Sequence, residues 1–123
     1  PLVDCFPSQL NQVLMNILAN AIDALESQKS LSTPQIQIHT KLLDNNRIAI
    51  HLSDNGSGIS PEIQSKLFDP FFTTKEIGKG TGLGLSISYQ IVVNKHGGNL
   101  SCKSIPGEGT EFIIEIPVSQ IDN

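Results

Sequence analysis

Four short segments of this chain alternate apolar and polar residues, and this two-residue period constrains the fold more than any other feature. Successive side chains of a strand point to opposite faces, so each segment predicts a strand with one buried face. Turn sequences at Asp44-Asn45-Asn46 and at Pro106-Gly107-Glu108-Gly109 divide the segments into two pairs. We therefore expect two pairs of adjacent strands, at residues 35–43, 48–54, 99–105 and 110–118.

Two longer segments repeat apolar residues every three or four positions, which is typical of amphipathic helices. The first runs from Ser8 to about Lys29 and the second covers about residues 82–96, where two glycines end it. Residues 60–67 begin with Ser-Pro, an N-cap followed by a first-turn proline, and predict a short helix. This order of elements predicts an α/β fold with an antiparallel or mixed sheet and all helices on one face.

Length and composition restrict the kind of protein further. A chain of 123 residues with 38% hydrophobic and 16% charged residues fits one globular domain, here residues 1–123. No apolar run reaches the roughly 18 residues of a membrane span, and the net charge of −4 without a basic stripe argues against nucleic acid as a partner. The first residues do not form a signal peptide, so we expect a fragment of a larger protein.

Two polar residues share the apolar face of their strands. Asp54 has the parity of Ile50 and Leu52, and Thr110 has that of Phe112. Asp54 is followed by glycines at 56 and 58, which leave room for a ligand. Either Asp54 caps its own turn through a backbone bond, or both polar groups line one pocket at the strand ends.

Asn16, Asn20 and Asp23 form one stripe on the first helix, because they are spaced four and three residues apart. Amide oxygens one turn apart suit a hard cation that keeps most of its water. A solvated helix face would show the same spacing.

Gly80-Thr81-Gly82-Leu83-Gly84 opens the second long helix, where free backbone N–H groups favour phosphate oxygens. The spacing matches neither a Rossmann fingerprint nor a Walker A loop, and a flexible hinge is the alternative. Lys75 and Lys79 add positive charge beside it. A carboxylate, a hydroxyl, an amide stripe and glycine amides together describe a nucleotide site.

From about Gln9 to Pro117 the chain resembles the catalytic ATP-binding domain of sensor histidine kinases. That domain belongs to the GHKL superfamily, with gyrase-type topoisomerases, mismatch-repair clamps and heat-shock chaperone ATPases. Four boxes of the family stand in order: NILANAIDA at 16–24, DNGSG at 54–58, FDPFFTTK at 68–75 and GTGLG at 80–84. The resemblance implies the Bergerat fold, an α/β two-layer sandwich with a mixed, mostly antiparallel sheet, and an ATP lid at residues 69–81.

The resemblance also implies a role for each matching residue. Asp54 would accept the adenine amino group, Thr110 would support the ring, and Asn20 would hold Mg²⁺ against the phosphates. Lys75 would contact the terminal phosphate and, with Asn16, is a candidate catalytic residue. Of Phe71 and Phe72, we expect one to anchor in the core and one to contact a partner. The remaining expected ATP-binding residues are Asn16, Gly56, Gly58, Gly80, Thr81, Gly82, Leu83 and Gly84.

Two departures from the family pattern matter. Position 23 is Asp where many histidine kinases have a Lys that could touch phosphate. Position 16 is Asn where the ATPases and serine kinases of the superfamily have a Glu as general base. An amide cannot activate water, which favours a histidine kinase over an ATPase.

The phosphoacceptor is expected outside this chain. His39, His51 and His96 are followed by Thr40, Leu52 and Gly97 rather than by the acidic residue of the family's acceptor motif. The expected partners are a dimerisation and phosphoacceptor histidine domain, a downstream response regulator and a second copy in a homodimer. The domain is expected to be cytoplasmic, although the full-length protein could be membrane-anchored. A non-transferring nucleotide-binding module and a GHKL-type ATPase clamp are the alternative functions.

Overall fold

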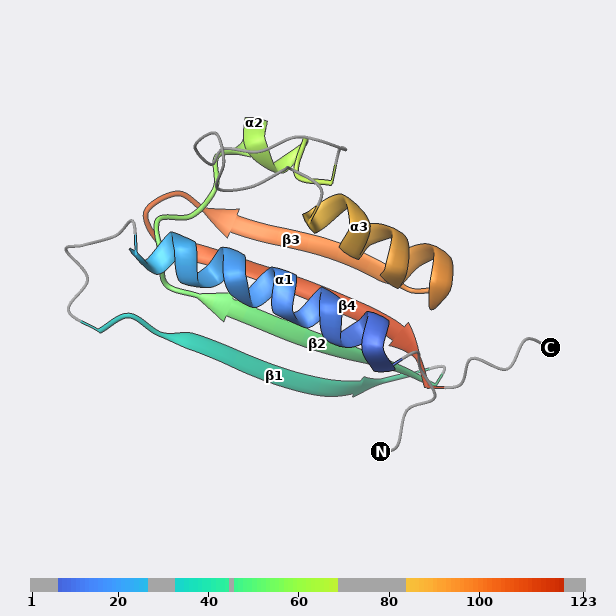
Figure 1. Ribbon diagram of the computed structural model, residues 1–123. Helices are drawn as coiled ribbons and strands as arrows, with labels where there is room; N and C mark the ends of the chain where they lie inside the picture. Colours follow the sequence, from blue (N-terminus) through green and yellow to red (C-terminus); the bar gives the residue numbers. More distant parts are fainter. Residues whose placement is uncertain (1–6, 27–32, 45, 69–83, 119–123) are drawn as a thin grey trace.

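The computed structural model describes residues 7–26, 33–44, 46–68 and 84–118. In chain order these residues form the helix α1 (Pro7–Glu26), the strands β1 (Ile36–Leu43) and β2 (Arg47–Asp54), the short helix α2 (Pro61–Gln64), the helix α3 (Gly84–Gln90) with its continuation η1 (Ile91–Lys95), and the strands β3 (Asn99–Ile105) and β4 (Gly109–Pro117) (Figure 1). Every element predicted from the sequence is therefore present. No helix in these residues is long and apolar enough to cross a bilayer.

The four strands form one sheet in the order β1-β2-β4-β3, and each neighbouring pair is antiparallel. The two predicted pairs, β1–β2 and β3–β4, lie side by side because β2 pairs with β4. In this register Asp54 is directly opposite Thr110, at the end where β2 finishes and β4 begins.

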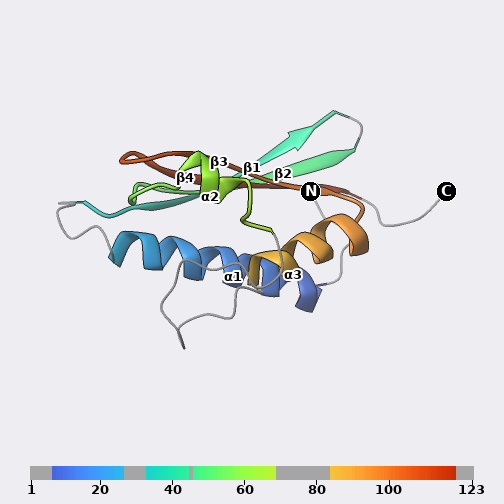
Figure 2. The same ribbon diagram turned by 90° about the horizontal axis from the view of Figure 1, so that it is seen from above.

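The helices α1 and α3 lie on one face of the sheet, as Figure 2 shows from above. The apolar stripe of α1 packs on β2, and α3 packs beside α1. The core between the two layers consists of Val13, Ile17, Ile50, Leu52, Leu67, Ile91, Val92, Leu100, Phe112, Ile114 and Ile116. Burial of these side chains is the main stabilising contribution, at about 1.5–3 kcal/mol for each large one.

The first hairpin does not have one fully buried face, so that expectation is wrong for β1. Ile38 is 60% exposed and Leu42 is 63% exposed, although their partners Leu52 and Ile48 face the helices. The reason is the position of β1 at the edge of the sheet (Figure 1), while α1 packs on β2. An alternating pattern predicts a face, but not whether another layer covers it.

The second long helix has a wider last turn than its period predicted. The His96 amide donates to the Ile91 carbonyl at 3.1 Å, five residues back, and the Gly98 amide donates to Val92 at 2.8 Å. This π-helical turn, η1, ends at Lys95 with His96 as its C-cap, and Gly97 follows with a φ of 65°. His96 is 1% exposed, and its Nδ1 lies 3.0 Å from the same Ile91 carbonyl. This imidazole is therefore a buried cap at the end of the helix.

The short helix begins as predicted and ends earlier. The Ser60 hydroxyl accepts a hydrogen bond from the Ile63 amide at 3.4 Å, and Pro61 occupies the first turn. The α-helix stops at Gln64 and continues as tighter turns, since the amides of Lys66 and Leu67 donate only three residues back. The turns that follow α2 place Leu67 in the core.

Candidate functional site

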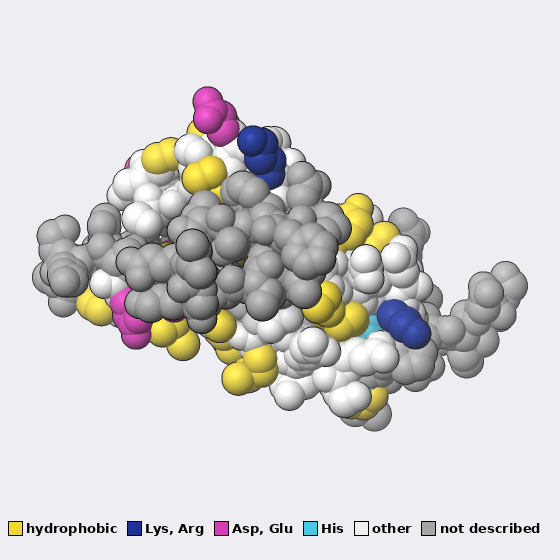
Figure 3. All heavy atoms as spheres, turned by 45° about the horizontal axis from the view of Figure 1, so that its top comes forward, with side chains coloured by type: hydrophobic (Ala, Val, Ile, Leu, Met, Phe, Trp, Pro, Cys, Tyr) yellow, Lys and Arg dark blue, Asp and Glu magenta, His cyan; other side chains and the backbone are white. Residues whose placement is uncertain are grey.

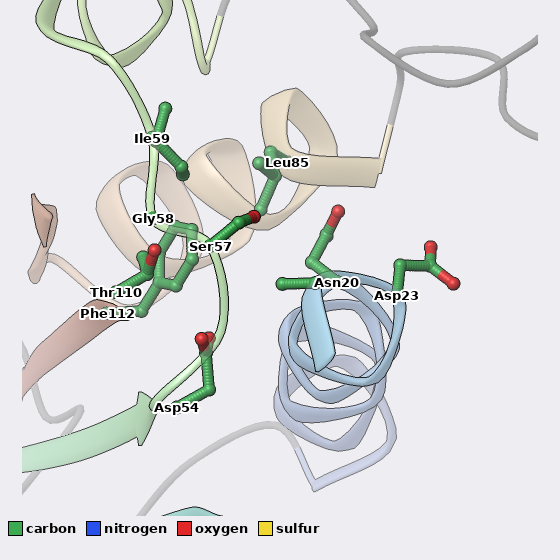
Figure 4. Close-up of a pocket in the computed structure, with 10 residues that line it drawn as sticks. Asn20, Asp23, Asp54, Ser57, Gly58, Ile59, Leu85, Thr110 and Phe112 are labelled. Atoms are coloured by element: carbon green, nitrogen blue, oxygen red, sulfur yellow. The ribbon is translucent and has the colours of Figure 1, made fainter. Parts of the chain in front are cut away.

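A cavity of about 280 Å³ opens between the end of the sheet and the two long helices. The residues around it come from α1, the end of β2, the loop that follows β2, the first turn of α3 and the start of β4 (Figure 4). They are Asn20, Asp23, Ala24, Asp54, Ser57, Gly58, Ile59, Leu85, Thr110 and Phe112. Five of the expected ligand residues or stripe residues thus meet in one place, namely Asn20, Asp23, Asp54, Gly58 and Thr110.

Asp54 supplies the carboxylate at the floor of this cavity. Its Oδ1 accepts a hydrogen bond from the Gly56 amide at 2.8 Å, and the carboxylate points into the pocket (Figure 4). Both interpretations of its inward parity therefore hold, because one oxygen caps the turn and the other remains available to a ligand. Burial raises the pKa of the Asp54 carboxyl above its ordinary value, and the Gly56 hydrogen bond partly offsets that increase.

Thr110 lies directly opposite Asp54 and is 6% exposed. Its Oγ1 lies 2.9 Å from the Oγ of Ser104 on the neighbouring strand β3. The apolar walls beside these polar groups are Ile59, Leu85 and Phe112. Polar groups at one end and apolar walls at the sides suit a flat ring with a polar edge.

The glycines after Asp54 permit close packing around the pocket. A Cβ on Gly58, which has a φ of 78°, would collide with the backbone carbonyl of Ile105. A Cβ on Gly56 would lie 2.9 Å from the Asp54 carboxylate and 3.0 Å from the Ala24 side chain. These glycines therefore allow α1 and the β3–β4 turn to lie close to the end of β2. The sequence predicted instead that glycine is needed here to leave room for a ligand.

The residues of the polar stripe on α1 have two different roles: two line the pocket, and one joins α1 to α3. Asn20 donates from Nδ2 to the Asn16 carbonyl at 2.9 Å, which leaves its amide oxygen as the group for a ligand. Asn20 and Asp23 lie together at the rim of the pocket (Figure 4). Asn16 is not among the lining residues, and its Nδ2 donates to the Ser88 hydroxyl at 3.2 Å, a contact that joins α1 to α3.

Several predicted site residues lie outside the described residues. They are Phe71, Phe72, Lys75, Lys79, Gly80, Thr81, Gly82 and Leu83, together with the lid at 69–81. Gly84 is described, and it is the first residue of α3. The pocket thus contains the base and metal ends of the predicted site.

Sequence reasoning did not select Ser104 or the apolar walls. Ser104 has the parity of Leu100 and Cys102, which point inward, so the alternating pattern of β3 contained that signal. Asn55 was also missed: its side chain bonds Gln35 N at 2.8 Å and Thr33 O at 2.9 Å, which fixes the end of β2 against the start of β1. These contacts join segments far apart in the chain.

Cys102 lies close to the pocket floor, and burial, followed by the charge of Asp54, raises the pKa of its thiol to about 12. At pH 8 its thiolate fraction is about a thousandfold below that of an ordinary thiol, which outweighs the higher nucleophilicity of a basic thiolate. We expect iodoacetamide to alkylate Cys102 at least about tenfold more slowly than glutathione. Mass spectrometry of the Cys5→Ser variant measures this rate. Alkylation as fast as that of glutathione would contradict the burial of the thiol.

The family model for histidine kinase-, DNA gyrase B- and HSP90-like ATPases (HATPase_c) matches residues 6–120. This span contains both long helices, all four strands and every lining residue of the pocket. The chain belongs to this family. The assignment made from the four boxes is thus confirmed, and the α/β fold with its antiparallel sheet agrees with it.

Curated relatives place the domain among sensor kinases. It is 42% identical over 112 residues to the two-component sensor PprA of Pseudomonas aeruginosa, covering 90% of this chain and 12% of that protein. It is 42% identical over 114 residues to the histidine-protein kinase AtoS of Escherichia coli, covering 93% and 17%. The chain therefore spans less than a fifth of the length of these two relatives.

Solved structures agree with the fold. The catalytic domain of histidine kinase ThkA has a TM-score of 0.79 at 34% identity, with 96% of this chain and 72% of that chain covered. The mycobacterial sensor histidine kinase MprB has a TM-score of 0.79 at 26% identity, with 97% and 78% covered. This HATPase_c domain is thus a catalytic ATP-binding domain of the histidine-kinase type.

Proposed function

We propose that this domain binds Mg-ATP and transfers the terminal phosphate to a histidine on a separate dimerisation and phosphoacceptor domain. The observation that carries the proposal is the pairing of Asp54 and Thr110 at the floor of an apolar-walled cavity. A related protein, full-length ShkA, has been solved in complex with AMPPNP, at 26% identity and a TM-score of 0.76. An ATP analogue in that relative supports ATP as the ligand here.

The pocket suits the adenine end of ATP. An ionised Asp54 is a hydrogen-bond acceptor, so it matches an exocyclic amino group and opposes the 6-oxo group of guanine. Ile59, Leu85 and Phe112 offer apolar surface to the faces or edges of the ring. This division of polar floor and apolar walls favours ATP and ADP over GTP.

Asn20 and Asp23 are the residues that would hold Mg²⁺. Asn20 donates to the Asn16 carbonyl through Nδ2, which leaves its amide oxygen for a metal ion. Asp23 adds a carboxylate at the same rim of the pocket. Amide and carboxylate oxygens are ligands that suit Mg²⁺. When bound, the metal neutralises charge on the phosphates. The acidic residue at position 23 favours a cation there rather than a direct phosphate contact.

The described histidines support an acceptor on another domain. His39 and His51 are cross-strand partners on the sheet face opposite the core, with ring centroids 5.8 Å apart, and His51 pairs with Glu111 at 3.4 Å. His96 is buried at the end of η1. None of the three lines the cavity. In the proposed transfer, the bond between the γ-phosphorus and the β–γ bridging oxygen breaks, a phosphorus–nitrogen bond forms on the partner's imidazole, and ADP leaves.

Asn16 favours this transfer over hydrolysis. Its side chain is an amide that donates to Ser88, and an amide does not take a proton from water at neutral pH. The domain would therefore catalyse by positioning the phosphate and neutralising its charge. Lys75 remains the candidate for the terminal phosphate. A response regulator, a homodimeric full-length protein and a cytoplasmic site of action follow from the same proposal.

Labelled ATP tests the proposal directly. The domain alone is expected neither to become phosphorylated nor to hydrolyse ATP appreciably, because the acceptor and the general base are both missing. Adding a separate dimerisation and phosphoacceptor domain in trans should produce an acid-labile phosphohistidine on that domain, and a His→Gln acceptor is the matched control. Rapid ATP turnover by the domain alone would favour the ATPase clamp. Binding without any transfer to the acceptor would favour the nucleotide-binding module.

A further inference from the structure

We propose that Ser104 is a positioning residue that fixes the direction of the Thr110 hydroxyl and thereby helps to select the base. With Ser104 in place, Asp54 and Thr110 both present hydrogen-bond acceptors at the pocket floor, and two acceptors select a base with an exocyclic amino group. The inference rests on the proposed function of the pocket as a nucleotide site. It assigns a role to a residue that does not itself line the cavity.

Ser104 lies next to the last residue of β3 and points inward beside Thr110. Its Oγ makes three contacts: 2.7 Å to the Ile59 amide nitrogen, 2.8 Å to the Gly109 carbonyl oxygen and 2.9 Å to Thr110 Oγ1. These partners come from the loop after β2 and from the start of β4. The Ser104 hydroxyl therefore joins β3 to the loop after β2 and to the start of β4.

The number of protons decides the direction of each bond. The Ile59 amide can only donate, and the Gly109 carbonyl can only accept. Since the Ser104 hydroxyl has a single proton, that proton must go to Gly109, or two acceptors would face each other at 2.8 Å. The remaining contact is a hydrogen bond only if Thr110 donates its own proton to Ser104. This is the single assignment in which all three contacts are hydrogen bonds.

Because the Thr110 hydroxyl donates its proton to Ser104, it can act toward the pocket only as a hydrogen-bond acceptor. Opposite it, Asp54 uses Oδ1 to accept from the Gly56 amide and keeps its other oxygen for the pocket. Two acceptors at a directly opposed strand pair can receive both hydrogens of an amino group, or those of a water molecule that bridges to the base. A 6-oxo group at the same place would face lone pairs on both sides. Ser104 thus directs the Thr110 proton away from the pocket, where that proton could otherwise be donated to a 6-oxo group.

The test compares ATP with ITP, which has a 6-oxo group in place of the 6-amino group. We expect wild-type protein to prefer ATP by about tenfold or more, and Ser104→Ala to reduce that ratio by about threefold or more, since Thr110 becomes free to donate. Ser104→Thr keeps the hydroxyl and should retain the wild-type ratio. In a Thr110→Val background, Ser104→Ala should leave the ratio unchanged. Calorimetry on the same preparations gives both dissociation constants, and loss of folded protein cancels in their ratio.

An unchanged ratio in Ser104→Ala, with ATP still bound, would overturn the inference and leave the proposed function standing. A wild-type protein that binds neither nucleotide would overturn the proposed function and the selection of the base together. The proton direction has its own readout in the ligand-free protein. We expect NMR to detect a slowly exchanging Thr110 hydroxyl proton and Ile59 amide in the wild type, and faster exchange of both in Ser104→Ala. Fast exchange of the Thr110 hydroxyl in the wild type would overturn the positioning role itself.

Discussion

Asp54→Asn is expected to weaken ATP binding by about 2 kcal/mol, or roughly 30-fold, because a charge-assisted hydrogen bond contributes about 1.5–3 kcal/mol. The Gly56 amide holds Oδ1 at 2.8 Å, so the new amide nitrogen would occupy the position that faces the pocket. That group donates, which opposes the adenine amino group and matches a 6-oxo base. Discrimination against GTP should therefore also decrease.

Stability should change in the opposite direction from binding. Burial raises the pKa of Asp54 in the folded protein, so its stabilising contribution is fully present below the unfolded-state pKa and is lost as pH rises through the raised folded-state value. At neutral pH the ionised group therefore destabilises the ligand-free fold. We expect Asp54→Asn to melt at the same temperature as wild type or higher.

Calorimetry and thermal melts check both results. Asp44→Asn is the matched control, because it removes a carboxylate from the exposed β1–β2 turn far from the pocket. ATP affinity of the wild type should also fall as pH decreases through the raised pKa of Asp54, and the Asp54→Asn variant should lack that component. Equal affinities of wild type for ATP and GTP would contradict the assignment of Asp54 to the base.

Asn20→Ala is expected to remove most of the enhancement of ATP binding by Mg²⁺. The Asn20 amide oxygen is left for a metal, since Nδ2 donates to the Asn16 carbonyl at 2.9 Å, whereas the Asn16 side chain donates to Ser88. Asp23 lies at the same rim and can retain a residual metal effect. The affinity for ATP without metal should change little, because no hydrogen bond among the described residues joins Asn20 to Asp54.

Titration of ATP with and without Mg²⁺ measures this loss. Asn11→Ala is the matched control, because Asn11 is an exposed Asn on the same helix and does not line the pocket. A full metal enhancement in Asn20→Ala would show that Asn20 is only a solvated helix residue. A reduced enhancement in Asn11→Ala as well would indicate a general effect on α1.

Figure 3 shows the distribution of charged side chains on one face of the molecule. On the face shown in Figure 3, the charged side chains of the described residues are few and scattered. The described basic residues therefore form no continuous patch on this face.

The sequence by itself determined the elements and the direction of their side chains. The two-residue period located all four strands, and parity put Asp54 and Thr110 on the buried face before any pairing was known. The three-to-four period located α1 and placed Asn20 beside the apolar stripe. These properties are local, because they follow from the geometry of one strand or one helix.

Only the tertiary structure decided which of these side chains meet. Pairing of β2 with β4 placed Asp54 opposite Thr110, and neither predicted hairpin implied it. The same sheet order left Ile38 and Leu42 exposed at an edge. The contacts of Ser104 with Ile59 are also long-range in sequence. A local pattern specifies where a side chain points, but the distance between two segments depends on how all layers pack, and that is a property of the whole chain.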